Sequence, residues 1–373
     1  MQLAFCIYKF FPFGGLQRDF LQIATACQAR GHQIRVYVLD WQGNKPAGFD
    51  IIIVPKKGLT NHSRNQAYYH WVKAHLKTNP ADCVVGFNKM PGLDVYFAGD
   101  TCFAEKTARK GFFYKLSNRY KHYLSFEQAV FDQSSTTKIM VLTKQQIQDF
   151  KNYYHTQNER FFLLPPGIAL DRKYSVYAPI KREQFRHKNQ INQDDFVIVQ
   201  IGSDFKRKGV DRSLKAIAAL PNESKQKVTY LVVGQDKPEL YQKLAEELNI
   251  AKHVRFFSGR DDIPDFLFSA DLLIHPARQE AAGMVLIEAL AAGLPVIVSG
   301  ISGYAYHISQ ANAGIVLTEP YHQNALDQAL AQLINDKEQW LSWHKNAIAY
   351  GNSEDLYHLA QRAADIILGC HHE

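Results

Sequence analysis

The sequence of 373 residues contains few cysteines and no long apolar run, and both shortages narrow the class of protein. The five cysteines are scattered without the paired spacing of a disulfide framework or a zinc site, which favours reduced thiols in a cytosolic protein. No apolar run reaches the ~18–20 residues that a membrane-spanning helix needs. The first residues, MQLAFCIYKF, lack the basic segment and cleavage site of a signal peptide, so we expect a β-strand there.

The sequence also lacks the G-x-G-x-x-G motif of dinucleotide-binding proteins. Gly14 and Gly15 follow the first apolar run, but no acidic residue stands after the second run, where a nicotinamide dinucleotide site requires one. This argues against nicotinamide-dependent redox chemistry. Two glycines before a helix nevertheless let the backbone approach a phosphate group closely, and the alternative is an ordinary tight turn.

Short apolar runs alternate with longer amphipathic segments along the chain, and this pattern predicts an α/β fold with doubly wound parallel sheets. The series stops at FFLLPPG and then begins again, so we expect two facing Rossmann-like domains with a ligand cleft between them. We predict one domain over residues 1–165 and a second over residues 166–353. The last segment, residues 354–369, is a predicted helix that can pack on either domain.

Charge is distributed unevenly between the two predicted domains. Residues 1–165 contain 21 basic against 11 acidic side chains, a net charge of +10, whereas residues 166–373 contain 22 against 25, a net charge of −3. The basic domain is expected to face an anionic partner.

Basic and aromatic residues are interleaved in the segment 103–126 of this domain. Its most prominent members are Lys106, Arg109, Lys110, Phe112, Phe113, Lys115, Arg119 and Lys121. Cations with aromatic anchors are typical of an interfacial element on an anionic membrane surface. A nucleic acid is the competing partner, but the negative second domain and the absence of an RNA-binding signature argue against it. In a third interpretation the aromatic rings pack on the sheet and the cations are merely solvated.

Two glutamates flank a predicted helix start in the stretch QEAAGMVLIEA. Glu280 follows the apolar run LLIHP, and Glu288 lies within an apolar helical pattern. The backbone amides of Ala282, Gly283 and Met284 are donors of a helix N-terminus and so form an anion site. Each carboxylate can accept hydrogen bonds from vicinal hydroxyls, so a nucleotide sugar would fit all three features. The alternative for Glu288 is a structural ion pair with a lysine or arginine.

The run E-A-A-G-M-V-L-I-E followed by A-L-A-A-G-L-P-V-I resembles the E-x7-E signature of the retaining glycosyltransferases of family four, which have the two-domain GT-B architecture. The resemblance covers nearly the whole chain. The segments FFPFGGLQRDF and GSDFKRKGVDRS are most similar to members that transfer glucose from UDP-glucose to an inner-core heptose of lipopolysaccharide. The resemblance implies a UDP-glucose-dependent hexosyltransferase that binds peripherally to the inner face of the cytoplasmic membrane. Two alternatives remain: another UDP-hexose or glycolipid acceptor, and a non-catalytic membrane-associated protein that binds a sugar nucleotide.

The resemblance assigns roles on the donor side. Glu280 would hold the sugar hydroxyls and Glu288 the ribose, while Lys208, the Gly14–Gly15 loop and the amides near Gly283 would hold the diphosphate. A lysine at this place neutralises charge on the leaving UDP.

Other donor-side positions differ from the residues usual in the family, or are equally consistent with ordinary surface residues. Members of the family carry an arginine five residues before the lysine, where this chain has Ser203, and Arg207 is a candidate replacement. Arg260 matches the place that borders the uracil base. The plain alternatives are a solvated basic turn over residues 206–208 and an ordinary surface arginine at 260.

The chain contains no D-x-D pair, so it lacks the carboxylates with which metal-dependent glycosyltransferases hold a divalent ion. We therefore predict transfer without a metal. The resemblance implies, in addition, that the departing phosphate oxygen deprotonates the acceptor hydroxyl. On the acceptor side, Asp19 and Asp100 are candidates to orient that hydroxyl, although each is otherwise an ordinary helix or loop acid. Asn88 and Lys89 stand where family members often carry a histidine.

Overall fold

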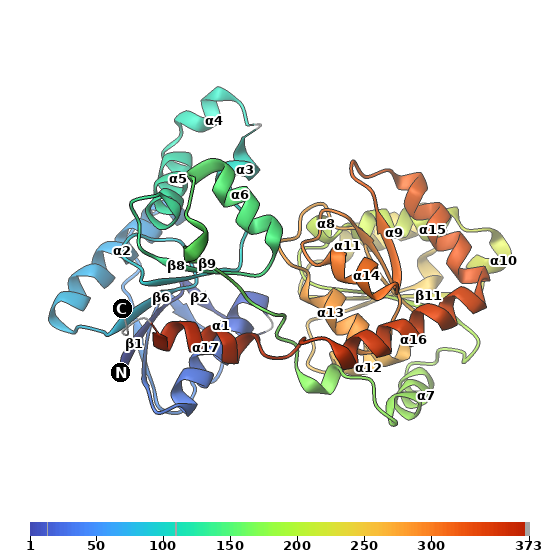
Figure 1. The fold of residues 1–373 in the computed structure, drawn as a ribbon. Helices are drawn as coiled ribbons and strands as arrows, with labels where there is room; N and C mark the ends of the chain where they lie inside the picture. Colours follow the sequence, from blue (N-terminus) through green and yellow to red (C-terminus); the bar gives the residue numbers. More distant parts are fainter. Residues whose placement is uncertain (13, 109, 370–373) are drawn as a thin grey trace. The chain divides into compact units, whose positions relative to one another are not determined.

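The computed structural model describes residues 1–12, 14–108 and 110–369, and the chain divides into two compact units (Figure 1). The first unit consists of Met1–Gly167 and the segment from His358 onward, and the second of Ile168–Tyr357. The sequence-based boundaries, after residues 165 and 353, differ from these limits by two and four residues. Each unit is a parallel sheet with helices around it, so the predicted α/β class is confirmed.

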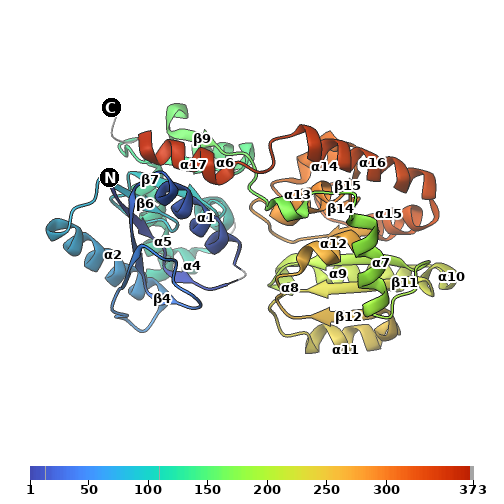
Figure 2. The same cartoon turned by 90° about the horizontal axis from the view of Figure 1, so that it is seen from below.

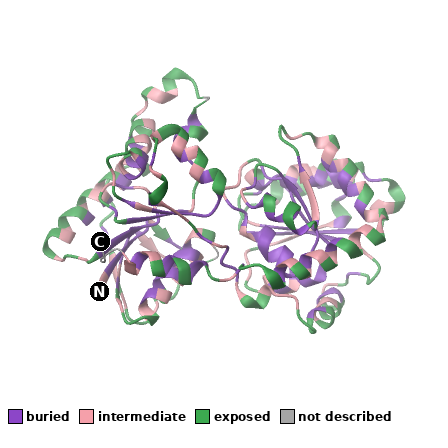
Figure 3. Ribbon diagram, viewed as in Figure 1, coloured by how far each residue is buried: buried purple, intermediate pink, exposed green. Residues whose placement is uncertain are grey.

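The first unit contains a seven-stranded parallel sheet in the order β5-β3-β1-β6-β7-β8-β9. Its strands, in chain order, are β1 (Gln2–Cys6), β3 (Gln33–Val38), β5 (Phe49–Ile53), β6 (Cys83–Gly86), β7 (Val95–Ala98), β8 (Lys138–Val141) and β9 (Phe161–Leu163). A separate two-stranded sheet joins β2 (Lys9–Phe10) to β4 (Asp40–Trp41). The central strands are apolar on both faces because helices cover both, and Figure 3 shows them buried.

The helices of the first unit include the one formed by the end of the chain. They are α1 (Gly15–Ala29), α2 (Asn61–Thr78), α3 (Phe103–Thr107), α4 (Phe112–Leu116), α5 (Asn118–Phe131), α6 (Lys144–Tyr154) and α17 (Leu359–Leu368). Helix α17 packs against α1, as both views show (Figures 1 and 2). Arg30 at the end of α1 forms a salt bridge of 2.8 Å with Asp365 of α17. The terminal helix therefore belongs to the first unit.

The second unit contains a six-stranded parallel sheet in the order β12-β11-β10-β13-β14-β15. Its strands are β10 (Phe196–Ile201), β11 (Val228–Val233), β12 (Val254–Phe257), β13 (Leu272–His275), β14 (Val296–Ser299) and β15 (Gly314–Leu317). Its helices are α7 (Ala178–Lys188), α8 (Phe205–Lys208), α9 (Val210–Ala219), α10 (Asn222–Lys225), α11 (Glu239–Glu247), α12 (Ile263–Ser269), α13 (Met284–Ala291), α14 (Ala305–Ala311), α15 (Gln323–Asn335) and α16 (Lys337–Ser353).

Within the ranges given above, no helix combines the length and the apolar character needed to cross a membrane. The same ranges contain no group of three or more His, Cys, Asp or Glu side chains suited to hold a metal ion.

Candidate functional site

The donor-side candidates of the second unit follow the carboxyl ends of its strands. Ser203, Arg207 and Lys208 come after β10, Arg260 comes after β12, and Glu280 comes after β13. Because the sheet is parallel, these loops lie at the same edge, where ligands of such sheets bind.

Glu280 is the centre of a cluster of donors at this edge. Its Oε2 atom accepts hydrogen bonds from Lys208 Nζ, from Arg207 Nη1 at 3.3 Å and from His275 Nε2 at 3.3 Å. The Glu280 side chain is 12% exposed. The structure thus brings together two predicted cations and one predicted carboxylate, and it adds a histidine.

This environment keeps Glu280 ionised. Burial by itself would raise the pKa of Glu280. The charge of Lys208 and the hydrogen bonds from His275 and Lys208 outweigh this effect and lower the pKa to well below its usual range. Burial and the nearby charge of Lys208 lower the pKa of His275, so its imidazole is neutral at pH 7. His275 is not among the residues predicted from the sequence. A lone histidine at the carboxyl end of a buried strand is the signal that marks it.

Local backbone geometry explains how Lys208 reaches this position. Gly202 follows β10 with φ of +136°, and a Cβ there would lie 2.9 Å from Lys208 Cε. Gly209 ends α8 with φ of +75°, and a Cβ there would lie 2.2 Å from the Pro276 carbonyl oxygen. Glycine is required at both places because other residues rarely adopt these angles and would collide. The two glycines let the short helix α8 direct Lys208 toward Glu280.

The N-terminus of α13 lies where the sequence predicted an anion site. Gly283 is its N-cap, with φ of +94°, and the first turn contains no acidic residue. The first amides of a helix have no acceptor within the helix, so those of Gly283 and Met284 favour an anion, whereas Ala282 precedes the N-cap. Glu280 stands three residues before the N-cap, at the side of this helix end.

Glu288 lies in the second turn of α13 and is only 5% exposed. Its Oε1 atom is 3.7 Å from Nε of Arg172, so its charge has a cationic partner within the second unit. This ion pair is the structural alternative that the sequence left open for Glu288. The sequence contained no signal for Arg172, which lies more than 100 positions away from its partner.

The remaining donor-side candidates make contacts of their own. The Ser203 hydroxyl accepts a hydrogen bond from the Gln235 amide at 3.0 Å, which joins the loops after β10 and β11. Arg260 forms two hydrogen bonds with Asp262, at 2.6 and 2.7 Å, and its guanidinium lies over the ring of Phe266. Ser203 carries no charge, and the second cation at Glu280 is Arg207.

The first unit contains the Gly14–Gly15 loop and Asp19, all on or beside α1. Gly14 is the N-cap of α1, and the first turn of this helix also contains no acidic residue. A Cβ on Gly15 would meet no atom within 4 Å, whereas a Cβ on Gly14 would lie 2.0 Å from Gln17 Oε1. Asp19 lies in the second turn and is 6% exposed.

Asp100 follows β7, and its side chain is 64% exposed. It accepts a hydrogen bond from the Tyr96 hydroxyl at 2.6 Å and lies 3.3 Å from Lys89 Nζ. Lys89 itself is buried and donates to Glu127 at 2.6 Å and to the Thr101 carbonyl at 3.1 Å. Burial lowers the pKa of Lys89, but the charges of Asp100 and Glu127 raise it more, so the lysine is charged. Lys89 therefore anchors the loops after β6 and β7.

The basic aromatic segment forms three helices, α3, α4 and α5. Phe112 and Phe113 of α4 are 71% and 87% exposed, and Leu116 is 50% exposed. Lys106, Lys110, Arg119 and Lys121 are exposed, and Lys115 donates to the Ala108 carbonyl. Arg109 lies outside the described residues. The interpretation in which all the rings pack inward is wrong for α4.

Comparisons with known proteins identify the family of the chain. The family model for glycosyl transferases group 1 matches residues 181–350, which include Lys208, Glu280 and Glu288. The lipopolysaccharide glucosyltransferase WaaG of Escherichia coli (strain K12) is 53% identical over 370 residues, 99% of each chain. A crystal structure of WaaG superimposes with a TM-score of 0.95 over 98% of this chain and 100% of that one.

A more distant structure shares the fold. Alr3699/HepE of Anabaena in complex with UDP-glucose has 16% sequence identity and a TM-score of 0.75, over 99% of this chain and 100% of that one. With the 53% identity to WaaG over almost the whole chain, these findings define the class. The chain belongs to the glycosyl transferases group 1 family, as its sequence predicted, and it is a glycosyltransferase.

Proposed function

We propose that the protein transfers glucose from UDP-glucose to an inner-core heptose of lipopolysaccharide, with retention of configuration and without a metal cofactor. The observation that carries the proposal is the cluster of Glu280, Lys208 and Arg207 beside the N-terminus of α13. The name of the 53% identical relative supports glucose and lipopolysaccharide as donor sugar and acceptor. The Anabaena complex shows that a protein of this fold binds UDP-glucose.

On the donor side, each group has a task suited to its chemistry. The ionised Glu280 accepts hydrogen bonds from the sugar hydroxyls, and Glu288, further along α13, accepts them from the ribose. Lys208, Arg207 and the first amides of α13 bind the diphosphate. These cations stabilise the negative charge that grows on UDP as its bond to glucose breaks, which is the task that a metal ion performs elsewhere.

On the acceptor side, Asp100 and Asp19 orient the hydroxyl that attacks. The departing phosphate oxygen takes the proton of this hydroxyl. Glu280 is engaged by the sugar hydroxyls, so it does not act as a nucleophile and no covalent intermediate forms. Attack from the face that UDP leaves gives retention. The Gly14–Gly15 loop adds backbone amides for the phosphates.

We also propose that α3, α4 and α5 settle on the anionic inner face of the cytoplasmic membrane, where a lipid-linked acceptor is found. The exposed rings of Phe112 and Phe113 with Leu116 provide apolar anchors, and the surrounding lysines and arginines provide attraction to acidic lipids.

A transfer assay tests the proposed function. The protein is incubated with purified truncated core and labelled UDP-glucose, with and without a chelator, and in parallel with UDP-galactose and UDP-N-acetylglucosamine. We expect transfer of glucose in preference to the other sugars, an unchanged rate with chelator, and an α-linkage by NMR. Binding of UDP-glucose without transfer to any core acceptor would instead support a non-catalytic binding protein. Transfer only from another UDP-hexose would correct the donor.

A further inference from the structure

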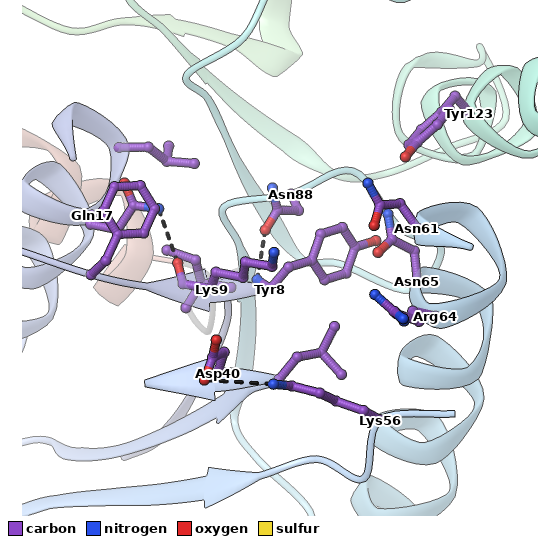
Figure 4. Close-up of a pocket in the computed structure, with 14 residues that line it drawn as sticks. Tyr8, Lys9, Gln17, Asp40, Lys56, Asn61, Arg64, Asn65, Asn88 and Tyr123 are labelled. Atoms are coloured by element: carbon purple, nitrogen blue, oxygen red, sulfur yellow. Dashed lines mark hydrogen bonds and ion pairs between the residues drawn. The ribbon is translucent and has the colours of Figure 1, made fainter. Parts of the chain in front are cut away.

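The first unit contains a polar pocket with a volume of about 340 Å³, separate from the Glu280 cluster of the second unit (Figure 4). It lies beyond the carboxyl ends of β1, β3, β5 and β6, beside the first turns of α2. Three of its lining residues, Lys9, Lys56 and Arg64, are cations. We call it the cationic pocket.

The charges in the cationic pocket do not cancel. Among its described lining residues, Asp40 is the only carboxylate, and it forms an ion pair of 3.6 Å with Lys56. Arg64 donates from Nε to the Gly58 carbonyl at 3.0 Å, which fixes the guanidinium without neutralising it. Lys9 and Arg64 therefore leave the pocket with an excess of positive charge, which favours an anion.

Helix α2 increases this preference. A capping box of Thr60 and Ser63 forms its N-terminus, and its first turn contains no acidic residue. Arg64 stands four residues into the helix, close to the end where the helix dipole already favours negative charge. A cation near a helix N-terminus is repelled by the positive end of the helix dipole. An anion bound between Arg64 and the N-terminus of α2 would relieve this repulsion.

An independent feature, Asn65, indicates that a ligand completes the pocket. The Asn65 side chain lines the pocket and the residue is only 8% exposed, yet its amide has no hydrogen-bond partner among the residues that the structure describes. Buried polar side chains are nearly always paired, so this amide is suited to a polar group of a ligand. Asn61 and Asn88 line the same pocket, and amides of this kind both donate to and accept from sugar hydroxyls.

We propose that the cationic pocket binds an acidic group, a carboxylate or a phosphate, of the acceptor saccharide. This inference rests on the proposed function and specifies the chemical class of acceptor. The proposed acceptor contacts Asp19 and Asp100 belong to the first unit, as does the cationic pocket. Lys9 and Arg64 bind the acid, and the asparagines bind neighbouring hydroxyls.

The test uses the full chain and a delipidated truncated-core oligosaccharide, so that membrane binding plays no part. Three forms of the oligosaccharide are compared: intact, with its phosphates removed, and with its carboxylates reduced to alcohols. At saturating UDP-glucose, we expect one of the two neutralised forms to lose at least tenfold in kcat/KM, mainly through KM, which identifies the acid. The double variant Lys9→Gln, Arg64→Gln should lose a similar factor on the intact acceptor and nothing further on the neutralised one.

Two controls make the result specific. Lys57→Gln removes one charge from an exposed neighbour that does not line the pocket, and it should leave all values unchanged. The KM for UDP-glucose should stay the same in every variant, which also shows that the variants are folded. If the double variant lowers kcat/KM equally for acidic and neutral acceptors, or not at all, the inference is overturned while the proposed function stands.

Direct binding separates the two failures. If the wild-type protein transfers glucose to none of the acceptors, the proposed function fails. Titration calorimetry with the same three oligosaccharides then judges the pocket without turnover. Binding that requires the acid together with Lys9 and Arg64 supports the inference, and binding that is indifferent to them contradicts it.

Discussion

The side chains around Glu280 illustrate how one carboxylate is kept ionised in a nearly buried place. Lys208, Arg207 and His275 converge on it, and the resulting pKa lies well below that of an ordinary glutamate. Lys208 is also the proposed partner of the diphosphate, so the same cation serves the ion pair with Glu280 and the bound UDP-glucose. Charge at this lysine is therefore expected to govern catalysis more than stability.

The variant Lys208→Met should lower kcat by about 10²–10³, the size of effect seen when one preorganised donor to a developing negative charge is removed. Steady-state kinetics with labelled UDP-glucose measures it. Lys206→Met, at an exposed position on the same short helix, is the matched control and should keep nearly full activity. Equal losses in both variants would mean that only the total charge of the turn matters.

The buried pair of Lys89 and Glu127 leads to a prediction about stability. Glu127 is fully buried and also accepts hydrogen bonds from the amides of Phe103 and Ala104, at 2.7 and 2.9 Å. Removing one partner leaves a buried charge unpaired, so Lys89→Met should lower the free energy of unfolding of the first unit by about 3–5 kcal/mol. Urea denaturation measures this change.

Two further variants serve as controls for this pair. Lys110→Met, at an exposed lysine, should change the free energy of unfolding by less than about 0.5 kcal/mol. The double variant Lys89→Met, Glu127→Gln should recover part of the loss, because it removes the unpaired charge. A double variant no more stable than Lys89→Met alone would contradict this account of the pair.

Single residues were predictable where a motif marked them and not where a contact did. Glu280, Lys208 and Gly283 stand in runs whose spacing and glycines indicate a helix start after a strand. Arg172 contacts Glu288 of the same site, but this partner lies on another element, and no local pattern reveals such a meeting.

At the scale of elements, the segment from α3 to α5 shows what composition can and cannot predict. Its mixture of cations and rings indicated an interfacial element, but not that Gly111 and Ser117 would break it into short helices as N-caps. The break places Phe112 and Phe113 at the exposed start of α4, while Phe126 of α5 is buried in the core of the unit. The aromatic residues of this one segment thus lie partly on the surface, in α4, and partly in the core, in α5.

The double variant Phe112→Ser, Phe113→Ser should weaken binding to vesicles of acidic phospholipid by about 100-fold or more, since each of the two rings contributes about 1.5–3 kcal/mol when it is buried in lipid. Co-sedimentation at low and high salt measures this. Leu240→Ser, at a position of the second unit that is 72% exposed, is the control for loss of an exposed apolar side chain and should have no effect. Vesicle binding that survives the double variant and Lys-to-Gln changes in α3–α5 would exclude this segment as the membrane contact.

At the scale of the whole molecule, buried histidines make stability depend on pH. Burial lowers the pKa of His122 in the first unit and of His307 in the second to about 4, and it also lowers the pKa of His275 and His344. An unfolded histidine has a pKa of about 6.5. Between these values the unfolded chain binds protons that the native chain does not, so the free energy of unfolding falls as the pH falls from 7 toward 4.

For His122 and His307 the loss at pH 5.5 should be up to about 1 kcal/mol each relative to pH 7.5. Urea denaturation at the two pH values measures it, and His122→Gln should flatten the dependence of the first unit. The exposed His70→Gln is the control and should leave the slope unchanged. A free energy of unfolding that rises or stays constant on acidification would contradict the sign.

The architecture of each unit was largely predictable, because buried parallel strands and amphipathic helices have clear periods. The destination of the last helix was not. Its apolar face suits either unit equally, and the salt bridge of Arg30 with Asp365 that accompanies its packing on α1 joins residues more than 300 positions apart. Long-range choices of this kind depend on complementary surfaces that a single sequence does not display.

The central claim is that a sugar nucleotide is held at the N-terminus of α13 by carboxylates on either side of it. Titration calorimetry of UDP-glucose with the full chain and with Glu288→Gln tests this most directly. Loss of charged hydrogen bonds to the ribose should weaken binding by about 10- to 100-fold, equivalent to about 1.5–3 kcal/mol. Equal affinity of Glu288→Gln and the wild type would show that the carboxylate serves its ion pair with Arg172 alone, and the proposed donor site would be wrong.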